Sequence, residues 1–94
     1  MSGVFSAIPG AMEAFSSANQ AAAAEISSAG SADSQAMLSA AAAALGPIGA
    51  SYLAAYGPAQ ANNLAATLLV AQVHAAIGGA TDASKATIIA ADNL

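Results

Sequence analysis

The chain has 94 residues, of which 31 are alanine, and its five carboxylates and one lysine give a net charge of −4. This length suits one small domain, and the negative charge excludes nucleic-acid binding because such a surface repels phosphate. The chain has no cysteine, which excludes a disulfide framework, a thiolate metal site and a cysteine nucleophile. Alanine favours helices but buries little area, so we expect the chain to bury its faces against another chain.

The first predicted element is a helix over about residues 8–45. Pro9 suits the first helical position, where its missing N–H would be unpaired anyway. A seam at spacings of three and four then indicates a helix that lies against a near-parallel neighbour; it consists of Ile8, Met12, Phe15, Asn19, Ala22 and Ile26. Asn19 is either a tolerated polar residue or one that fixes the register through a buried partner. The small residues beside it favour the first interpretation.

Two segments interrupt this pattern. Residues 30–34 form a soft spot, where Asp33 or Ser34 could cap a restarted helix. The seam then resumes with Leu38, Ala41, Leu45, Ile48 and Tyr52. The strongest breaker is Gly46-Pro47-Ile48-Gly49, because proline removes a backbone donor and two glycines loosen the chain around it. We expect the turn of an antiparallel helix-turn-helix hairpin near Gly46–Gly49.

The return helix is predicted over about residues 50–92, with a kink at 57–58 where Gly57-Pro58 lacks a second glycine. If these two breakers exchange roles, the turn moves by about ten residues. The return helix is apolar on two adjoining faces, and a hairpin can cover only one of them. The second face therefore needs a partner chain or self-assembly. One stripe is Asn63, Ala66, Val70, Val73 and Ile77, and the other is Leu64, Leu68, Ala71 and Ala75.

Residues that could carry chemistry are few and scattered. His74 is the single histidine and has no carboxylate three or four residues away, so we interpret it as structural and not as a catalytic base. The carboxylates form no oxygen-rich metal loop, and the glycine pairs form no phosphate-binding motif. Tyr52 and Tyr56 share a helix face and are expected to pack near the turn. We expect no enzyme activity, no metal and no cofactor.

Export and membrane signals are also weak. The first residues lack a basic group and a continuous apolar core, so no Sec-type signal peptide is expected. Two uncharged windows, 35–56 and 64–80, approach the length of a membrane span. Both are diluted by small and polar residues, and no Lys or Arg cluster flanks them. Membrane contact is therefore possible but not favoured.

The chain resembles a family of mycobacterial proteins associated with type VII (ESX) secretion, of the EspC/EspF type. The opening Met1-Ser2-Gly3-Val4-Phe5-Ser6-Ala7-Ile8-Pro9 is similar to the start of EspF-like proteins, whereas the related PE proteins have Pro-Glu where this chain has Pro9-Gly10. Gly46-Pro47-Ile48-Gly49 falls where the family turns, at the Trp-x-Gly motif of the wider WXG-type family, and it lacks the Trp. Asn62-Asn63-Leu64-Ala65-Ala66 and the chain end also resemble that branch.

One part of the family pattern departs from expectation. Substrates of these systems carry Tyr-x-x-x-Asp/Glu after the second helix as part of an export signal. Here the matching stretch is Ile88-Ile89-Ala90-Ala91-Asp92, so the acid is present and Ile88 replaces the tyrosine. The resemblance therefore implies either export with a partner that carries the tyrosine, or a chain that is not exported.

These observations favour an all-α hairpin that is half of a larger helical bundle and acts without catalysis. The resemblance implies a secreted or cell-envelope factor needed for ESX secretion or virulence, whose partner is a helical protein of the EspE, EspA or PPE-like kind in a four-helix bundle. The alternatives are a self-assembling filament or envelope tube and a membrane-active hairpin. The expected interface consists of Ile8, Met12, Phe15, Ile26, Leu64, Leu68, Val70, Val73 and Ile77.

Overall fold

The computed structural model describes residues 6–93, and these residues are helical over almost their whole length. Helix α1 covers Pro9–Leu45, a turn of 3-10 helix covers Gly46–Gly49, and helix α2 covers Ala50–Asp92. Residues 1–5, on which part of the family resemblance and the expected absence of a signal peptide rest, lie outside the described residues. Pro9 occupies the start of α1, where a missing N–H costs nothing.

The predicted division into two helices separated by a turn, as half of a bundle, needs correction. Helical backbone continues over the 84 residues Pro9–Asp92, because Gly46–Gly49 is itself a turn of 3-10 helix. No third or fourth helix is present between residues 6 and 93, so this chain does not form a bundle by itself. The fold is therefore one continuous helical run, within which the 3-10 turn separates α1 from α2.

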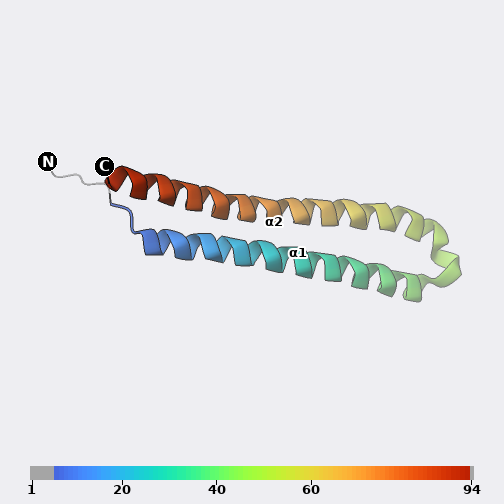
Figure 1. Cartoon of the computed structure of the whole chain (residues 1–94). Coiled ribbons are helices and arrows are strands. Elements are labelled where there is room, and N and C mark those ends of the chain that lie inside the picture. The colour runs from blue at the N-terminus through green and yellow to red at the C-terminus, as the bar shows by residue number, and fades with distance from the viewer. Residues whose placement is uncertain (1–5, 94) are drawn as a thin grey trace.

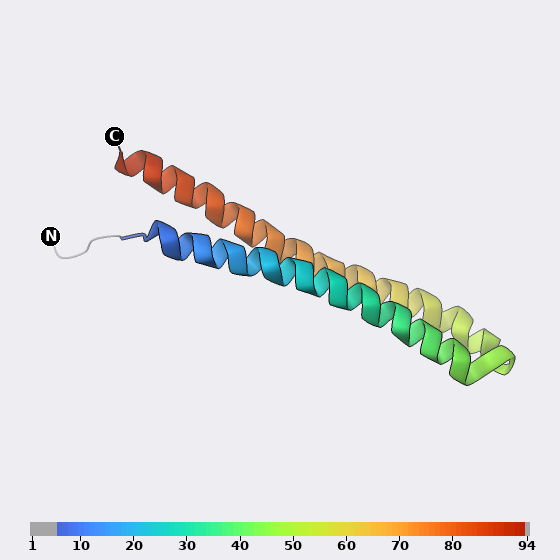
Figure 2. The same ribbon diagram turned by 60° about the horizontal axis from the view of Figure 1, so that its bottom comes forward.

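The direction of this run changes at the 3-10 turn. A straight α-helix of the 84 residues Pro9–Asp92 would be about 126 Å long at 1.5 Å per residue, whereas the molecule measures 74 × 22 × 17 Å. Helices α1 and α2 lie side by side and antiparallel, so both ends of the described chain lie together (Figure 1). Figure 2 shows the two helices crossing at a shallow angle and separating toward that end. We call it the open end.

Glycine is required at the 3-10 turn. Gly46 has a φ of 55°, which lies in the left-handed region that side chains with a Cβ atom disfavour, and its N–H donates to the carbonyl of Ala42. A Cβ atom on Gly49 would collide with the side chain of Leu45. Ile48 is fully exposed at the tip of the turn. The turn residues Gly46, Pro47 and Gly49 thus reverse the chain within a single 3-10 turn.

The predicted soft spot at residues 30–34 is absent, because α1 continues through it. A Cβ atom on Gly30 would lie 2.8 Å from Thr67 Cγ2, so the missing side chain lets the two helices approach each other. Ser34 is buried beside this contact. Pro58 likewise lies inside α2 and does not end it. Gly30 and Pro58 therefore lie within helices that continue past them.

The contact between α1 and α2 is made chiefly by small and polar residues. Ala71 is the single buried apolar residue in the described range, and no large side chain there is fully buried. The other buried residues form what we call the inner seam, together with Ala71: Ser16, Asn19, Ser34, Gln60 and Gly78. Close backbone approach and hydrogen bonds, more than buried hydrocarbon, hold the two helices together.

Candidate interaction surface

Large apolar side chains lie on the outside of the molecule. Phe15 is 55% exposed, Val73 is 58% exposed and Ile8 is 66% exposed. The remaining exposed large apolar residues are Met37, Leu45, Ile48, Tyr52, Leu69, Val70, Ile77 and Ile89. A water-exposed apolar surface of this extent marks an interaction site in a monomeric protein.

The two apolar stripes predicted on α2 have different surroundings. Leu64, Leu68, Ala71 and Ala75 are buried or half-buried against α1. The stripe that begins at Asn63 is exposed at each of its positions, and we call its apolar part, Val70, Val73 and Ile77, the outer stripe. Because α1 covers one face of α2 and nothing within residues 6–93 covers the other, the outer stripe is free for another chain.

The seam predicted on α1 is rotated relative to the observed contact. Asn19, Met12 and Ile26 are buried or half-buried as that seam requires, but Ile8 and Phe15 are mostly exposed. Ser16, which the periodicity of apolar residues does not include, lies in the contact instead. Small polar residues carry no apolar signal, so the hydrophobic pattern places the seam on the apolar neighbours of the true contact.

At the open end, an apolar hollow of about 670 Å³ lies between α1 and α2. Four residues of the predicted interface line it: Ile8, Met12, Phe15 and Ile77. Ile77 also belongs to the outer stripe, with Val73 one turn and Val70 two turns before it along α2. The structure thus joins four predicted interface residues into one surface that continues along the outer stripe.

Midway along the helices, a smaller hollow of about 360 Å³ lies between Asp33 on α1 and Asn63 on α2. Its walls include two more predicted interface residues, Ile26 and Leu64, together with Gln60 from the inner seam. We call it the middle hollow. Unlike the hollow at the open end, it combines apolar walls with a carboxylate and amide groups.

A cluster of polar side chains at the inner seam holds the two helices in register near the open end. Ser16 Oγ donates to the carbonyl of Gly78 at 3.0 Å, and Gln20 Nε2 donates to the carbonyl of Ala75 at 3.2 Å. A Cβ atom on Gly78 would lie 2.5 Å from Gln20 Nε2 and 3.1 Å from the Ser16 carbonyl oxygen. The sequence alone does not indicate this close contact at Gly78, which depends on the fold.

Asn19 and His74 belong to the same cluster of polar side chains. His74 Nδ1 lies 3.0 Å from Asn19 Oδ1, and Asn19 Nδ2 donates to the carbonyl of Phe15. Since the amide nitrogen is already used, the Asn19 oxygen accepts and His74 Nδ1 carries the proton. His74 thus takes part in the contact between the helices, and this contact favours Asn19 as a residue that fixes the register. The interpretation of Asn19 as a merely tolerated residue is therefore wrong.

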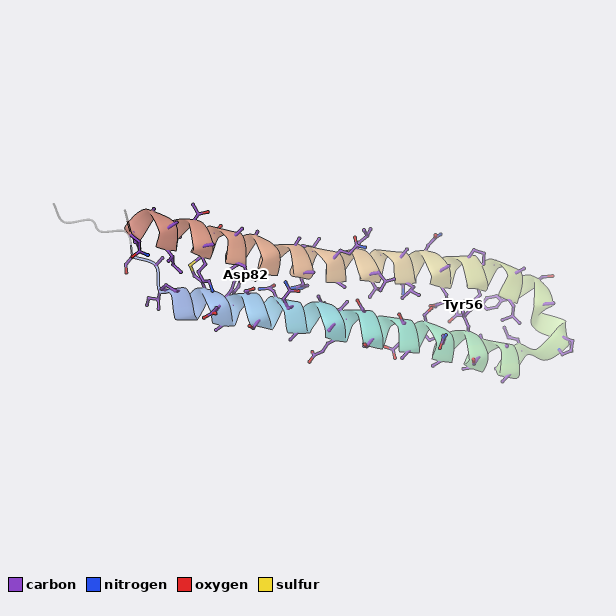
Figure 3. All side chains as sticks on the ribbon, viewed as in Figure 1. Tyr56 and Asp82 are labelled. Atoms are coloured by element: carbon purple, nitrogen blue, oxygen red, sulfur yellow. The ribbon has the colours of Figure 1, made fainter. Side chains whose placement is uncertain are left out.

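The aromatic pair near the turn packs as predicted. The rings of Tyr52 and Tyr56 stack with their centroids 5.7 Å apart, and Figure 3 labels Tyr56 at this end of α2. Gln60 Nε2 donates to the Tyr56 hydroxyl at 3.0 Å. The other end of that amide, Gln60 Oε1, is buried and has no hydrogen-bond partner among the described residues. A buried acceptor without a partner costs free energy, so Gln60 Oε1 lowers the stability of the isolated chain.

The chain has few charged residues. Lys85 Nζ pairs with Glu13 Oε1 at 3.2 Å near the open end. The described residues contain no group of three or more metal-binding side chains. Ile88, in the export pattern, is half-buried, and Asp92 is the exposed last residue of α2 one turn later. The export pattern therefore leaves its acid accessible at the open end.

The helical run contains an 18-residue stretch with a mean hydropathy of 1.5, of which 11% is buried. By length and composition alone it is apolar enough to cross a membrane, a property shared by core helices of soluble proteins and by signal sequences. The 3-10 turn at Gly46–Gly49 interrupts the helical run, and the carboxylates Glu13 and Asp92 near its two ends are exposed.

No family model, curated protein or solved structure matches the chain. The resemblance to proteins of type VII secretion therefore rests on the short motifs quoted from the sequence. It stays a prediction, and the surface geometry is independent of it.

Proposed function

We propose that this chain works by association with another helical protein and has no catalytic role. One observation carries the proposal: Ala71 is the single buried apolar residue between residues 6 and 93, while eleven large apolar side chains are exposed. Burial of apolar surface is the main favourable term in folding. A chain that leaves this surface in water gains much of its stability when another chain covers it.

The size of the exposed surface supports the proposal. The solvent-accessible surface of the chain is 6320 Å², whereas a compact monomer of 8.9 kDa is expected to expose about 4,800 Å². The difference is roughly 1,500 Å², and each partner of a standard protein interface buries about 800 Å². The extended form therefore offers ample area for a stable interface over the outer stripe and the hollow at the open end.

Apolar contacts on this surface are worth enough to decide the state of the chain. Phe15, Val70, Val73 and Ile77 are between 38% and 58% exposed, so covering what remains of these four side chains contributes about 3–6 kcal/mol. That range reaches the lower part of the whole stability of a small domain, about 5–15 kcal/mol. We expect the isolated chain to be poorly folded or aggregated and its partner complex to be folded.

The association is tested by sedimentation velocity and by circular-dichroism melts at several chain concentrations. The double variant Val70→Ser, Val73→Ser should weaken association, because it removes apolar area from the outer stripe. The matched control, Ala61→Ser with Ala86→Ser, changes two exposed alanines of α2 outside the stripe and should have little effect. A stable monomer whose sharp melt does not depend on concentration would contradict the proposal.

We also propose, on the family resemblance, that the chain is a substrate or associated factor of type VII secretion and is exported with its partner. Ile88 stands where the export pattern has tyrosine, and Asp92 supplies the acid. If the partner carries the tyrosine, Asp92→Ala should leave co-export unchanged, as should the matched variant Asp82→Ala. Loss of export in Asp92→Ala alone, with the complex intact, would show that this chain carries its own signal.

A second candidate is a self-assembling structural subunit, and the exposed outer stripe supports it as well. Copies of the chain would then cover the outer stripe of one another. Purified protein without any partner should form ordered polymers visible by electron microscopy. Amorphous precipitate that dissolves on addition of a helical partner would instead support association with a different protein.

A further inference from the structure

The two hollows lie on the same side of the molecule. Phe15 at the open end and Asp33 at the middle hollow are 18 residues apart on α1, which is five helical turns and about 27 Å. On α2, Ile77 and Asn63 are 14 residues apart, close to four turns. Val70 lies between them and is exposed. Both hollows therefore open on the same side of the helix contact, and we call this side, from the apolar open end to the polar middle hollow, the groove.

The middle hollow contains hydrogen-bond acceptors that lack donors from this chain. Gln60 is 8% exposed, and its Oε1 atom has no hydrogen-bond partner within residues 6–93. Asp33 lines the same hollow and forms no ion pair in the described part of the chain. A carboxylate beside an unpaired amide oxygen is complementary to a side chain that carries positive charge and several N–H donors.

A second copy of this chain does not supply such a group. The chain has one lysine and no arginine, and Lys85 pairs with Glu13 in its own chain. The remaining formal charges, Glu25, Asp33, Asp82 and Asp92, are negative. Charge complementarity therefore favours a different chain as the occupant of the groove.

On these grounds we propose that the groove binds one helix of a partner protein, with an apolar stripe at the open end and a lysine or arginine at the middle hollow. The basic side chain pairs with Asp33, and Gln60 Oε1, which is enclosed in the free chain, turns toward the hollow to accept a hydrogen bond from it. The apolar stripe packs on Phe15 and Ile77. An amphipathic helix in a hydrophobic groove is a recurrent mode of recognition. The inference rests on the proposed function and specifies the chemistry of the partner.

The probe is a synthetic 28-residue helix built on alanine and glutamine. It carries leucines at spacings of three and four over four turns and one lysine 18 residues from the middle leucine. A control peptide has norleucine in place of the lysine. Because a helix can lie in the groove in either direction, both peptides are also made with the reversed sequence. Binding is measured by fluorescence anisotropy and by the gain in helical circular dichroism of the full chain.

We expect the lysine peptide to bind about three- to tenfold more tightly than the norleucine peptide, the range of a partly exposed, hydrogen-bonded ion pair. Asp33→Asn should remove this preference, and Asp82→Asn, which changes an exposed carboxylate outside the hollow, should keep it. Gln60→Leu should reduce the preference for the lysine peptide, and Phe15→Ser should weaken the binding of both peptides equally. Added salt should reduce the difference in affinity between the two peptides, because it screens the ion pair.

Other results overturn the inference and separate it from the proposed function. Equal binding of both peptides, unchanged by Asp33→Asn, would refute the basic anchor while leaving association intact. Self-association through Phe15 and Ile77 without peptide binding would identify a second copy as the occupant and refute the inference alone. A stable monomer that binds neither peptide would refute the inference together with the proposed function.

Discussion

Replacing Gly78 with alanine tests whether close approach at the inner seam holds the two helices in register. The new Cβ atom would lie 2.5 Å from Gln20 Nε2 and 3.1 Å from the Ser16 carbonyl oxygen. The Gln20 side chain can swing away, but it then loses its hydrogen bond to the Ala75 carbonyl. The Ser16 carbonyl belongs to the backbone and cannot move by itself, so α1 and α2 must separate by a few tenths of an ångström.

The net effect follows from two opposing terms. Alanine gains about 0.8–1.0 kcal/mol over glycine inside a helix. The substitution strains the hydrogen bonds made by Ser16 and Gln20, each worth about 0.5–1.5 kcal/mol, so Gly78→Ala should destabilise the fold by about 1 kcal/mol. Gly79 has nothing within 4 Å of a Cβ atom, and Gly79→Ala should stabilise by about 0.8 kcal/mol. The two neighbouring variants should thus differ by about 2 kcal/mol.

Thermal melts followed by circular dichroism measure this difference. The melts are run at one fixed chain concentration, because association makes the Tm depend on concentration. For a domain of this size 1 kcal/mol corresponds to roughly 4–8 °C, so the two Tm values should differ by about 8–16 °C. Equal stabilisation by Gly78→Ala and Gly79→Ala would refute the close contact. In a Gln20→Ala background the penalty at Gly78 should shrink, because one of the two obstructing groups is gone.

Three further predictions follow from the described contacts. Because Asn19 presents its oxygen to the ring, neutral His74 should be protonated at Nδ1, which ¹⁵N chemical shifts can show; a spectrum typical of the Nε2–H tautomer would contradict this geometry. Glu13→Gln should lower the Tm by no more than about 4 °C, because Glu13 is 66% exposed in its pair with Lys85 and exposed pairs contribute roughly 0–1 kcal/mol; a loss above 10 °C would refute a minor role. Val70→Asp should abolish association in sedimentation experiments while the circular dichroism of the partner stays unchanged, and unaltered association would exclude the outer stripe as the interface.

Helical content and the reversal of direction near residues 46–49 could be predicted from the sequence, because alanine content and the Gly46-Pro47-Ile48-Gly49 breaker are local signals. The continuity of the helical run could not. A 3-10 turn satisfies some of the backbone hydrogen bonds that a non-helical connection would leave open, and its stability depends on the contact between the helices on either side. The prediction of a break at residues 30–34 was wrong for a related reason, because Gly30 packs against Thr67 and the helix continues there.

The sequence predicts which apolar residues are available for an interface better than it predicts where they lie relative to the two helices. Val70, Val73 and Ile77 are exposed together, as expected for a stripe that α1 cannot cover. Ile8 and Phe15 were assigned to a seam against a neighbouring helix and to the expected partner interface, and they lie mostly outside the contact between α1 and α2. Hydrophobic periodicity reports apolar residues, whereas the contact here is made largely by serine, asparagine, glutamine and glycine. Only the packed structure shows which of these polar residues meet.

The small and polar character of the inner seam affects how stability depends on temperature. Exposure of apolar surface on unfolding raises the heat capacity, and exposure of polar surface lowers it. Ala71 is the one buried apolar residue among residues 6–93, and Leu64 and Leu68 are only half-buried. Separating α1 from α2 should therefore change the heat capacity less than unfolding a core of large apolar side chains would. The contact between the helices should therefore persist on cooling, whereas the attachment of a partner to the outer stripe should weaken in the cold. Chilling would then release the partner before it separates the two helices.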